Sequence, residues 1–155
     1  MERTLVFIKP DAIQRGLSGE VISRLEKKGL KIIGVKMTQL SNEMVEEHYT
    51  HLSDKGFFEE FKNYVLSSPV IAICLEGVDC VEVVRSVCGV TNARAAAAGT
   101  IRGDLAMSVQ YNLVHAADSR EAAQREIGRF FKPDELFDYQ RSELQYFYSS
   151  YELKT

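Results

Sequence analysis

The side chain best suited to covalent chemistry is His115, which lies in an apolar run and is followed closely by Asp118. An unperturbed imidazole has a pKa near ~6.5, so much of it is neutral and nucleophilic at neutral pH. A single histidine in an apolar run is, however, more often a core residue than a catalyst. The residue type therefore permits nucleophilic catalysis without establishing it.

Glu126 is an anomaly on the amphipathic helix that we predict over residues 119–131. A carboxylate on a buried face needs a partner, because an unpaired buried charge is very unfavourable. One hypothesis is that Glu126 binds one imidazole nitrogen of His115 and leaves the other nitrogen free to attack. Equally open is an ion pair with Arg125 or Arg129 at the border of the apolar arc. At about 100° per residue that arc consists of Ala122, Ala123, Ile127, Phe130 and Phe131.

Three cations on separate elements are candidates for an anion site. Lys9 ends the first predicted strand, Arg85 lies on a predicted helix, and Arg102 lies in a loop. Arginine suits phosphate because its planar guanidinium bonds two oxygens at once. From residue statistics alone, three unrelated surface charges are the better hypothesis. The chain has no Gly-rich Walker loop and no Rossmann glycine fingerprint, so a nucleotide site would have to hold phosphate with side chains.

The other two histidines, His48 and His51, lie near Glu46 and Glu47 on a helix that we predict at the surface. For both imidazoles we expect a solvated position.

The three cysteines, Cys74, Cys80 and Cys88, have no paired spacing. Their odd number argues against a disulfide framework and suits a reducing compartment. Because Cys74 and Cys80 are surrounded by apolar residues, we expect both to be small buried hydrophobic side chains.

Hydrophobic periodicity predicts alternating strands and helices. The strands are expected at 4–9, 31–40, 70–75 and 113–116, and the helices at 18–28, 41–51, 57–66, 78–88 and 119–131. Residues 89–108 contain a four-alanine run and show no clear period, and long irregular loops are usually functional. The order is a βαββαβ pattern with additions, which is typical of an α+β ferredoxin-like sheet.

Length and composition indicate one ordinary domain over residues 1–155, with 45% hydrophobic and 26% charged residues. We expect the C-terminal segment 134–155, which includes a tyrosine-rich tail at about 140–155, to pack on the body or on a neighbouring subunit. The segment 134–155 carries four of the seven tyrosines: Tyr139, Tyr146, Tyr148 and Tyr151.

A formal charge of -3 argues against non-specific nucleic-acid binding, which depends on neutralising phosphates. No apolar run is long enough to span a bilayer, and the N-terminus leads directly into a predicted strand, without a signal peptide. We therefore expect a cytoplasmic protein with no membrane partner.

Four segments in one register resemble the nucleoside diphosphate kinase family, and the resemblance covers about residues 3–140. They are Lys9–Leu17 (KPDAIQRGL), Thr91-Asn92, Gly99–Asp104 (GTIRGD) and Asn112–Ser119 (NLVHAADS). Several motifs in the right order are far more specific than any single short match. The resemblance implies a four-stranded antiparallel ferredoxin-like sheet with flanking helices. It also implies a homo-oligomer, either a hexamer or a tetramer.

The resemblance implies a ping-pong transfer of the γ-phosphoryl group from a nucleoside triphosphate to a nucleoside diphosphate. His115 matches the nucleophile that becomes a phosphohistidine, and Glu126 matches the glutamate that orients it. Phe57 matches the aromatic residue that stacks on the base, so base selectivity should be weak. The family's remaining phosphate, ribose and catalytic contacts match Lys9, Tyr49, Arg85, Thr91, Arg102 and Asn112.

Mg²⁺ is the implied cofactor, carried by the nucleotide phosphates without a ligand from the protein. The loop at 89–108 matches the segment that closes the nucleotide site and reaches the subunit contacts.

Two departures from the family pattern affect the expected properties. Ala117 replaces a serine near the phosphoryl group, and a lost hydrogen bond of about 0.5–1.5 kcal/mol predicts slower catalysis, by about tenfold at most. Ala93 and Ala98 stand where the family commonly has proline, which predicts a softer loop and a weaker assembly.

Two other functions were weighed. The first is a catalytically weak family member that acts as a nucleotide-binding or interaction protein, supported only by Ala117. The second is an RNA-binding ferredoxin-like module, which would carry an aromatic and basic signature that this chain lacks.

Overall fold

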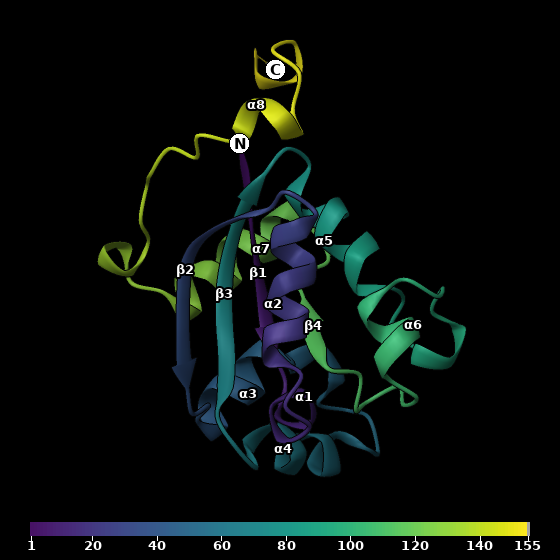
Figure 1. Cartoon of the computed structure of the whole chain (residues 1–155). Coiled ribbons are helices and arrows are strands. Elements are labelled where there is room, and N and C mark those ends of the chain that lie inside the picture. The colour runs from purple at the N-terminus through teal and green to yellow at the C-terminus, as the bar shows by residue number, and fades with distance from the viewer. Residues whose placement is uncertain (155) are drawn as a thin grey trace.

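A four-stranded antiparallel sheet forms the centre of the protein, with the strand order β2-β3-β1-β4 (Figure 1). The computed structural model describes residues 1–154. The predicted α+β ferredoxin-like fold is confirmed. The central strand β1 pairs with β3 on one side and with β4 on the other. The strands are β1 (Glu2–Ile8), β2 (Lys31–Thr38), β3 (Val70–Gly77) and β4 (Val114–Ala116).

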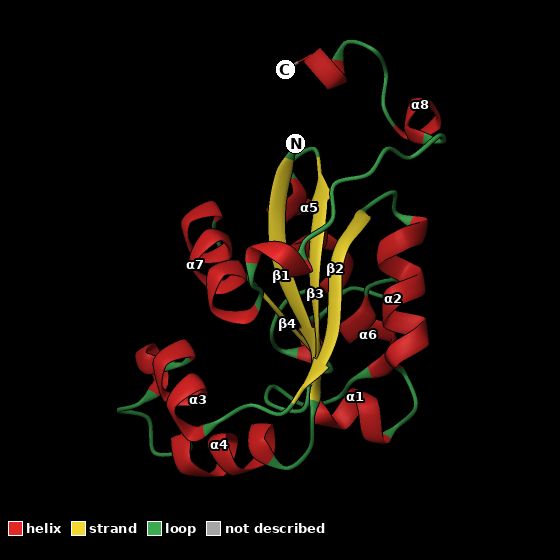
Figure 2. Ribbon diagram, turned by 90° about the vertical axis from the view of Figure 1, so that its left-hand side faces the viewer, coloured by secondary structure: helices red, strands yellow, loops and turns green. Residues whose placement is uncertain are grey.

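Helices cover both faces of this sheet (Figure 2). Alternate residues of β1 face the two layers. Leu5 and Phe7 pack in a core with α3, α4 and α7, whereas Val6 and Ile8 pack in a second core with α2 and α5. Burial on both faces explains why β1 is a continuous apolar run. The longer helices are α2 (Ser18–Lys27), α3 (Asn42–His48), α4 (Phe58–Leu66), α5 (Cys80–Cys88) and α7 (Arg120–Phe130).

Local signals explain most helix ends. Ser41 accepts a hydrogen bond from the backbone N–H of Met44, and Ser119 caps α7 in the same way, so both predicted helix starts are confirmed. The helix predicted over 41–51 ends earlier, at His48. A separate 3₁₀ turn, η1 (Thr50–Leu52), follows it. The helix predicted from residue 78 begins at Cys80 instead.

The chain leaves β1 before Pro10, and a short helix that the periodicity did not predict follows. Pro10 starts a short helix, α1 (Pro10–Gln14). Proline suits the first helical position, because its fixed φ is helical and its missing N–H has no intrahelical acceptor there.

The segment 89–108 is more ordered than predicted. It contains η2 (Ala93–Ala95) and α6 (Ile101–Leu105), which begin at caps made by Asn92 and Thr100. The alanine run does not extend η2 into a longer helix, because Ala96 is already extended, with ψ of 138°. Two short capped elements carry too little periodicity to be seen in the sequence.

The tail lies along the outer edge of β2. The backbone N–H of Phe137 donates to the Ile33 carbonyl at 2.8 Å, and the Tyr139 hydroxyl donates to the Ile32 carbonyl at 2.7 Å. Contact with the body, one of the two expected positions, is therefore observed for this part of the tail. The 3₁₀ turn η3 (Pro133–Glu135) precedes these contacts, and α8 (Leu144–Phe147) and η4 (Glu152–Lys154) follow them.

All three cysteines are free and buried, as expected for Cys74 and Cys80. Within residues 1–154, no helix has the length and apolar character that crossing a bilayer requires.

Gly103 in α6 allows the chain to approach itself closely, because a Cβ at this position would overlap the Ala97 carbonyl oxygen. We expect Gly103→Ala to lower the free energy of unfolding by about 1–3 kcal/mol, since the backbone must move to admit the methyl group. Thermal or denaturant unfolding measures this change.

Gly19→Ala is the matched control. It also lies in a helix, but a methyl group there meets nothing within 4 Å among the described residues. This variant should be unchanged or more stable by up to about 1 kcal/mol. Equal stability of the two variants would contradict the close packing at Gly103.

Candidate active site

The strand β4 is only three residues long, and it places His115 against the centre of the sheet. His115 pairs with Phe7 in the register of β1 and β4, and the two rings stack at 4.6 Å between centroids. Before the strand, Leu113 has a φ of 74°, which is unusual for a branched residue. Asp11 stabilises this conformation by accepting the Leu113 N–H at 3.1 Å, and the Lys9 N–H donates to the Leu113 carbonyl at 2.8 Å.

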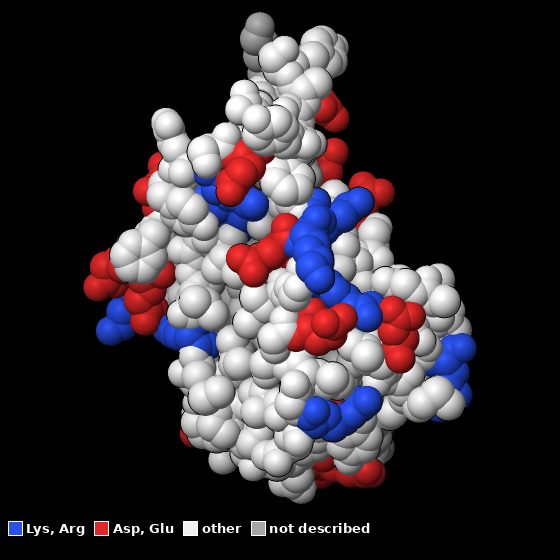
Figure 3. Space-filling view, in the orientation of Figure 1, with Lys and Arg blue, Asp and Glu red and all other residues white. Residues whose placement is uncertain are grey.

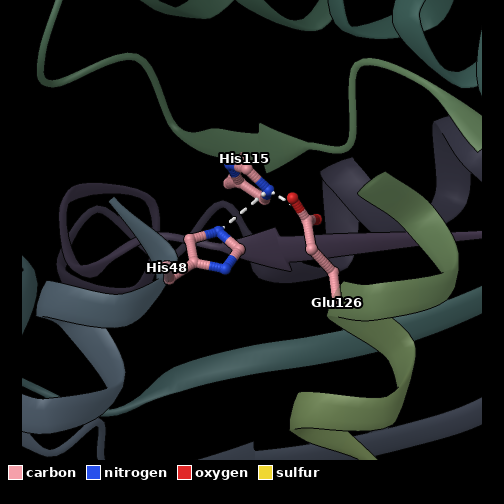
Figure 4. A group of neighbouring side chains, drawn as sticks. All are labelled: His48, His115 and Glu126. Atoms are coloured by element: carbon pink, nitrogen blue, oxygen red, sulfur yellow. Dashed lines mark hydrogen bonds and ion pairs between the residues drawn. The ribbon is translucent and has the colours of Figure 1, made fainter. Parts of the chain in front are cut away.

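Glu126 reaches His115 from α7. Its Oε2 lies 2.9 Å from Nε2 of His115 (Figure 4). Arg129 pairs with Glu47 instead, at 2.6 Å, so of the two hypotheses the structure shows the imidazole contact. No hydrogen bond joins Nδ1 of His115 to any residue in 1–154.

The imidazole of His115 is neutral at physiological pH. Burial, followed by the charges of Lys9 and Arg102, holds its pKa well below the ordinary value. Burial also raises the pKa of Glu126, although Arg129 opposes this shift. A neutral imidazole with one nitrogen occupied and the other unbonded has the form that a nitrogen nucleophile requires.

His48 contacts the candidate nucleophile, so its predicted solvated position was wrong. Its Nε2 lies 3.1 Å from Nε2 of His115 (Figure 4). Its Nδ1 lies 3.1 Å from the Arg129 guanidinium. The missed signal was helical spacing, because Val45, His48 and Tyr49 fall at i, i+3 and i+4 on the inner face of α3. His51 is exposed, as predicted.

Lys9 is a buried cation. Its ammonium donates to Asn112 Oδ1 at 2.7 Å and to the Gln110 carbonyl at 3.1 Å. Burial, followed by the charge of Arg102, lowers the pKa of Lys9 to about 7, whereas Asp11 acts in the opposite direction. A cation held in this way is ready to accept an anionic ligand.

Arg102 makes hydrogen bonds to the backbone around the site. Its guanidinium donates to the carbonyls of Gly89, Val114 and Asn112, at 2.6, 2.8 and 3.3 Å. Further N–H groups of the guanidinium remain, so this contact is compatible with the predicted anion binding.

All the predicted site residues line one cavity of about 510 Å³, a size typical of ligand sites. Arg85 and Thr91 are exposed in its wall, and Phe57 is 40% exposed. Tyr49 is buried, and its hydroxyl has no hydrogen-bond partner within residues 1–154. The full predicted set in this wall is Lys9, Tyr49, Phe57, Arg85, Thr91, Arg102, Asn112, His115 and Glu126.

The same wall contains Asp118 and Phe61, to which the sequence analysis gave no role in the site. Asp118 was noted only for its position three residues after His115. Phe61 lies in the helix predicted over 57–66, and its ring centroid is 5.5 Å from the Lys9 ammonium.

One group of possible metal ligands converges in the part of the chain that the structure describes: His48, His115 and Glu126. The obligate donor Arg129 lies against Nδ1 of His48, so the proton of this neutral imidazole belongs on Nε2. An Nε2 that carries a proton cannot bind a metal. This geometry therefore does not favour a resident transition metal.

Ala117 is buried, and its methyl group packs with Val81, Ala122 and Ala123. Ala122 and Ala123 precede Glu126 by one helical turn, so they lie on the same face of α7. A hydroxyl at position 117 would therefore lie beside the face that carries Glu126.

The sequence and structure were compared with known proteins. The family model described as nucleoside diphosphate kinase matches residues 2–136. A nucleoside diphosphate kinase of Parabacteroides distasonis is 53% identical over 150 residues, which are 97% of this chain and 98% of that protein. One from Pyrococcus horikoshii is 53% identical over 91% of this chain and 92% of its own length.

Solved structures agree with the sequence comparison. A halophilic nucleoside diphosphate kinase from Halobacterium salinarum, in complex with CDP, superposes with a TM-score of 0.93 at 43% identity. The match covers 96% of this chain and 99% of that one. The chain therefore belongs to the nucleoside diphosphate kinase family, whose members are phosphotransferases. The resemblance noted in the sequence is confirmed.

Lys9 makes anion binding depend on pH. A bound polyphosphate raises the pKa of Lys9 above the free value of about 7, so binding between these two values takes up a proton. We expect affinity for inorganic tripolyphosphate to fall above pH 7, by at most about tenfold per pH unit from this group. Titration calorimetry at pH 8 in buffers of different ionisation enthalpy measures the uptake.

Lys9→Arg is the control, because arginine stays protonated throughout this range. The wild type should take up more protons at pH 8 than this variant. Equal proton uptake would show that Lys9 is already charged in the free protein.

Proposed function

We propose that this protein transfers the γ-phosphoryl group of a nucleoside triphosphate to a nucleoside diphosphate, through a phosphohistidine at His115. The observation that carries the proposal is the His115 imidazole itself. Its Nε2 contacts Glu126, and its Nδ1 is unbonded in a cavity lined by three cations. The relatives' name, and the CDP of the halophilic structure, support a nucleotide as the ligand.

In the first half-reaction, the lone pair of Nδ1 attacks the γ-phosphorus. The bond from phosphorus to the bridging oxygen breaks, and its electron pair leaves with the nucleoside diphosphate. In the second half-reaction, a terminal phosphate oxygen of another diphosphate attacks the phosphohistidine and restores Nδ1. One acceptor that takes and returns the same group makes the exchange ping-pong.

Catalysis by the surrounding residues is mainly positioning and electrostatic stabilisation, because a transferring phosphoryl group spreads its charge over its oxygens. Lys9, Arg85 and Arg102 supply positive charge, and Thr91 supplies a hydroxyl donor. Asn112 holds the Lys9 ammonium through its Oδ1.

The hydroxyl of Tyr49 is buried without a partner in residues 1–154, and a bound phosphate or ribose oxygen would provide one. Phe57, at the exposed edge of the cavity, would stack on the base. Stacking reads the face of a base and not its hydrogen-bonding edge, which favours broad nucleotide specificity.

The cofactor is a divalent metal ion, which we propose is Mg²⁺ bound to the nucleotide phosphates. When bound, it neutralises phosphate charge. The cavity wall supports delivery with the nucleotide, because Glu126 is committed to His115 and cations dominate the rest.

We further propose a cytoplasmic homo-oligomer, hexameric or tetrameric, built from one domain over residues 1–155. Three unpaired cysteines suit a reducing compartment.

The edge strand β2 exposes Val35 and Met37, by 54% and 60%, which is typical of a surface that a second subunit covers. Positive and negative side chains are mixed on the face shown in Figure 3, which does not favour nucleic-acid binding.

The central test is to incubate the protein with γ-labelled ATP and Mg²⁺, and then to add GDP. We expect acid-labile label on the wild type and its transfer to GDP, because Nδ1 of His115 forms the intermediate. His115→Ala should take up no label. Nucleotide binding without label on the wild type would instead support the nucleotide-binding protein.

A second prediction concerns Ala117. We expect Ala117→Ser to raise kcat by up to about tenfold, since a hydroxyl beside Glu126 adds one hydrogen bond near the imidazole. Val81→Thr is the matched control, because it adds a hydroxyl to the same apolar cluster from α5 and not from the helix that carries Glu126. If kcat of Ala117→Ser equals that of the wild type, the missing hydroxyl does not limit the rate.

A further inference from the structure

Two groups compete for one nitrogen of His115. Glu126 Oε2 lies 2.9 Å from Nε2 of His115, and Nε2 of His48 lies 3.1 Å from the same atom (Figure 4). An imidazole nitrogen either donates one hydrogen bond or accepts one. Its protonation therefore decides which of the two neighbours it can bind.

The proton of His48 is fixed by a third residue. The Arg129 guanidinium, which can only donate, lies 3.1 Å from Nδ1 of His48. Arg129 is itself held by Glu47, through Nε at 3.0 Å and Nη2 at 2.6 Å. Burial keeps His48 neutral, because its pKa is lowered far below the ordinary value. Nδ1 is thus the acceptor, and Nε2 carries the proton that faces His115.

The reactive form of His115 has its proton on Nε2, where Glu126 accepts it, and its lone pair on Nδ1. In that form two N–H groups face each other across 3.1 Å, and the His48 donor has no acceptor. When Nε2 of His115 has no proton, it accepts from His48 instead. The contact with His48 therefore favours the second form.

We propose that His48 is a positioning residue that stabilises phosphorylated His115, by donating a hydrogen bond to its deprotonated Nε2. The inference rests on the function proposed above. When Nδ1 attacks the γ-phosphorus, the bond to the leaving diphosphate breaks with its electron pair and the ring becomes positive. The Nε2 proton then moves to the Glu126 carboxylate, which leaves both groups neutral. The reverse transfer returns this proton to Nε2.

The surroundings of Glu126 fit this proton transfer. Glu126 is mostly buried, and its pKa is raised above the ordinary value of a glutamate. The lone pair of Nε2 then accepts a hydrogen bond from His48, and it shares this lone pair with the acid proton of Glu126. Phosphorylation thus replaces a contact between two donors by a contact between the His48 donor and a shared acceptor.

Nitrogen NMR of the histidine rings tests the proton position without any turnover. In the free wild type, we expect His48 to be protonated on Nε2 and unprotonated on Nδ1. Arg129→Met removes the donor to Nδ1, and the His48 ring should become a mixture of both tautomers. A wild-type His48 with its proton on Nδ1 would overturn the proposal, whether or not the protein is ever phosphorylated.

Two substitutions separate hydrogen bonding from packing. His48→Phe keeps a ring near Phe7 and Phe130, whose centroids lie 5.5 and 5.6 Å from that of His48, but it removes the donor. His48→Gln removes the ring and keeps an amide donor that reaches the position of Nε2. Both are compared with the wild type at one fixed ratio of ATP to ADP, and the ratio of phosphorylated to free enzyme is measured.

We expect this ratio to fall about two- to tenfold in His48→Phe and to stay near the wild-type value in His48→Gln. The opposite order would show that His48 acts only by packing and would overturn the proposal. Equal ratios in all three proteins would overturn it as well. If the wild type takes up no phosphate, the proposed function fails, while the NMR result still decides the His48 tautomer.

Discussion

The site depends on the pairing of a three-residue strand with the central strand of the sheet. β4 meets β1 over Val114–Ala116, and this pairing alone places His115 beside Phe7. So short a ladder needs support at both ends. The backbone bond from Lys9 to Leu113 supplies it on one side, and the bond from Ala117 to Leu5 on the other. The candidate nucleophile is therefore held by the sheet and not by a mobile loop.

Burial determines the chemistry of this position. Beside the sheet, charged forms are disfavoured, so His115 stays neutral and Lys9 has a pKa near neutrality. Buried polar groups in the site need hydrogen-bond partners. Lys9 binds Asn112, and Glu126 binds His115. Two groups are exceptions: the Tyr49 hydroxyl has no hydrogen-bond partner within residues 1–154, and Nε2 of His115 has two neighbours, Glu126 and His48. Such unresolved polar groups are typical of sites that a ligand or a chemical step completes.

Arg102 both binds backbone carbonyls and lines the ligand cavity. Its bonds to Gly89, Val114 and Asn112 connect the end of α5, the strand β4 and the turn before it. A change in the loop that carries Arg102 is thus also a change in the strand that carries His115. Gly103, the residue after Arg102 in α6, approaches the Ala97 carbonyl so closely that there is no room for a side chain.

The sequence by itself determined the strands and long helices, the βαββαβ order and the anomaly of Glu126, because these follow from local periodicity. The resemblance carried by the order of the motifs also named nine residues that line the cavity, but not His48. Only the tertiary structure decided the partners. His48 meets His115 across 67 residues, and Lys9 meets Asn112 across 103. No periodicity reports such distant contacts, because they depend on how the sheet brings remote segments together.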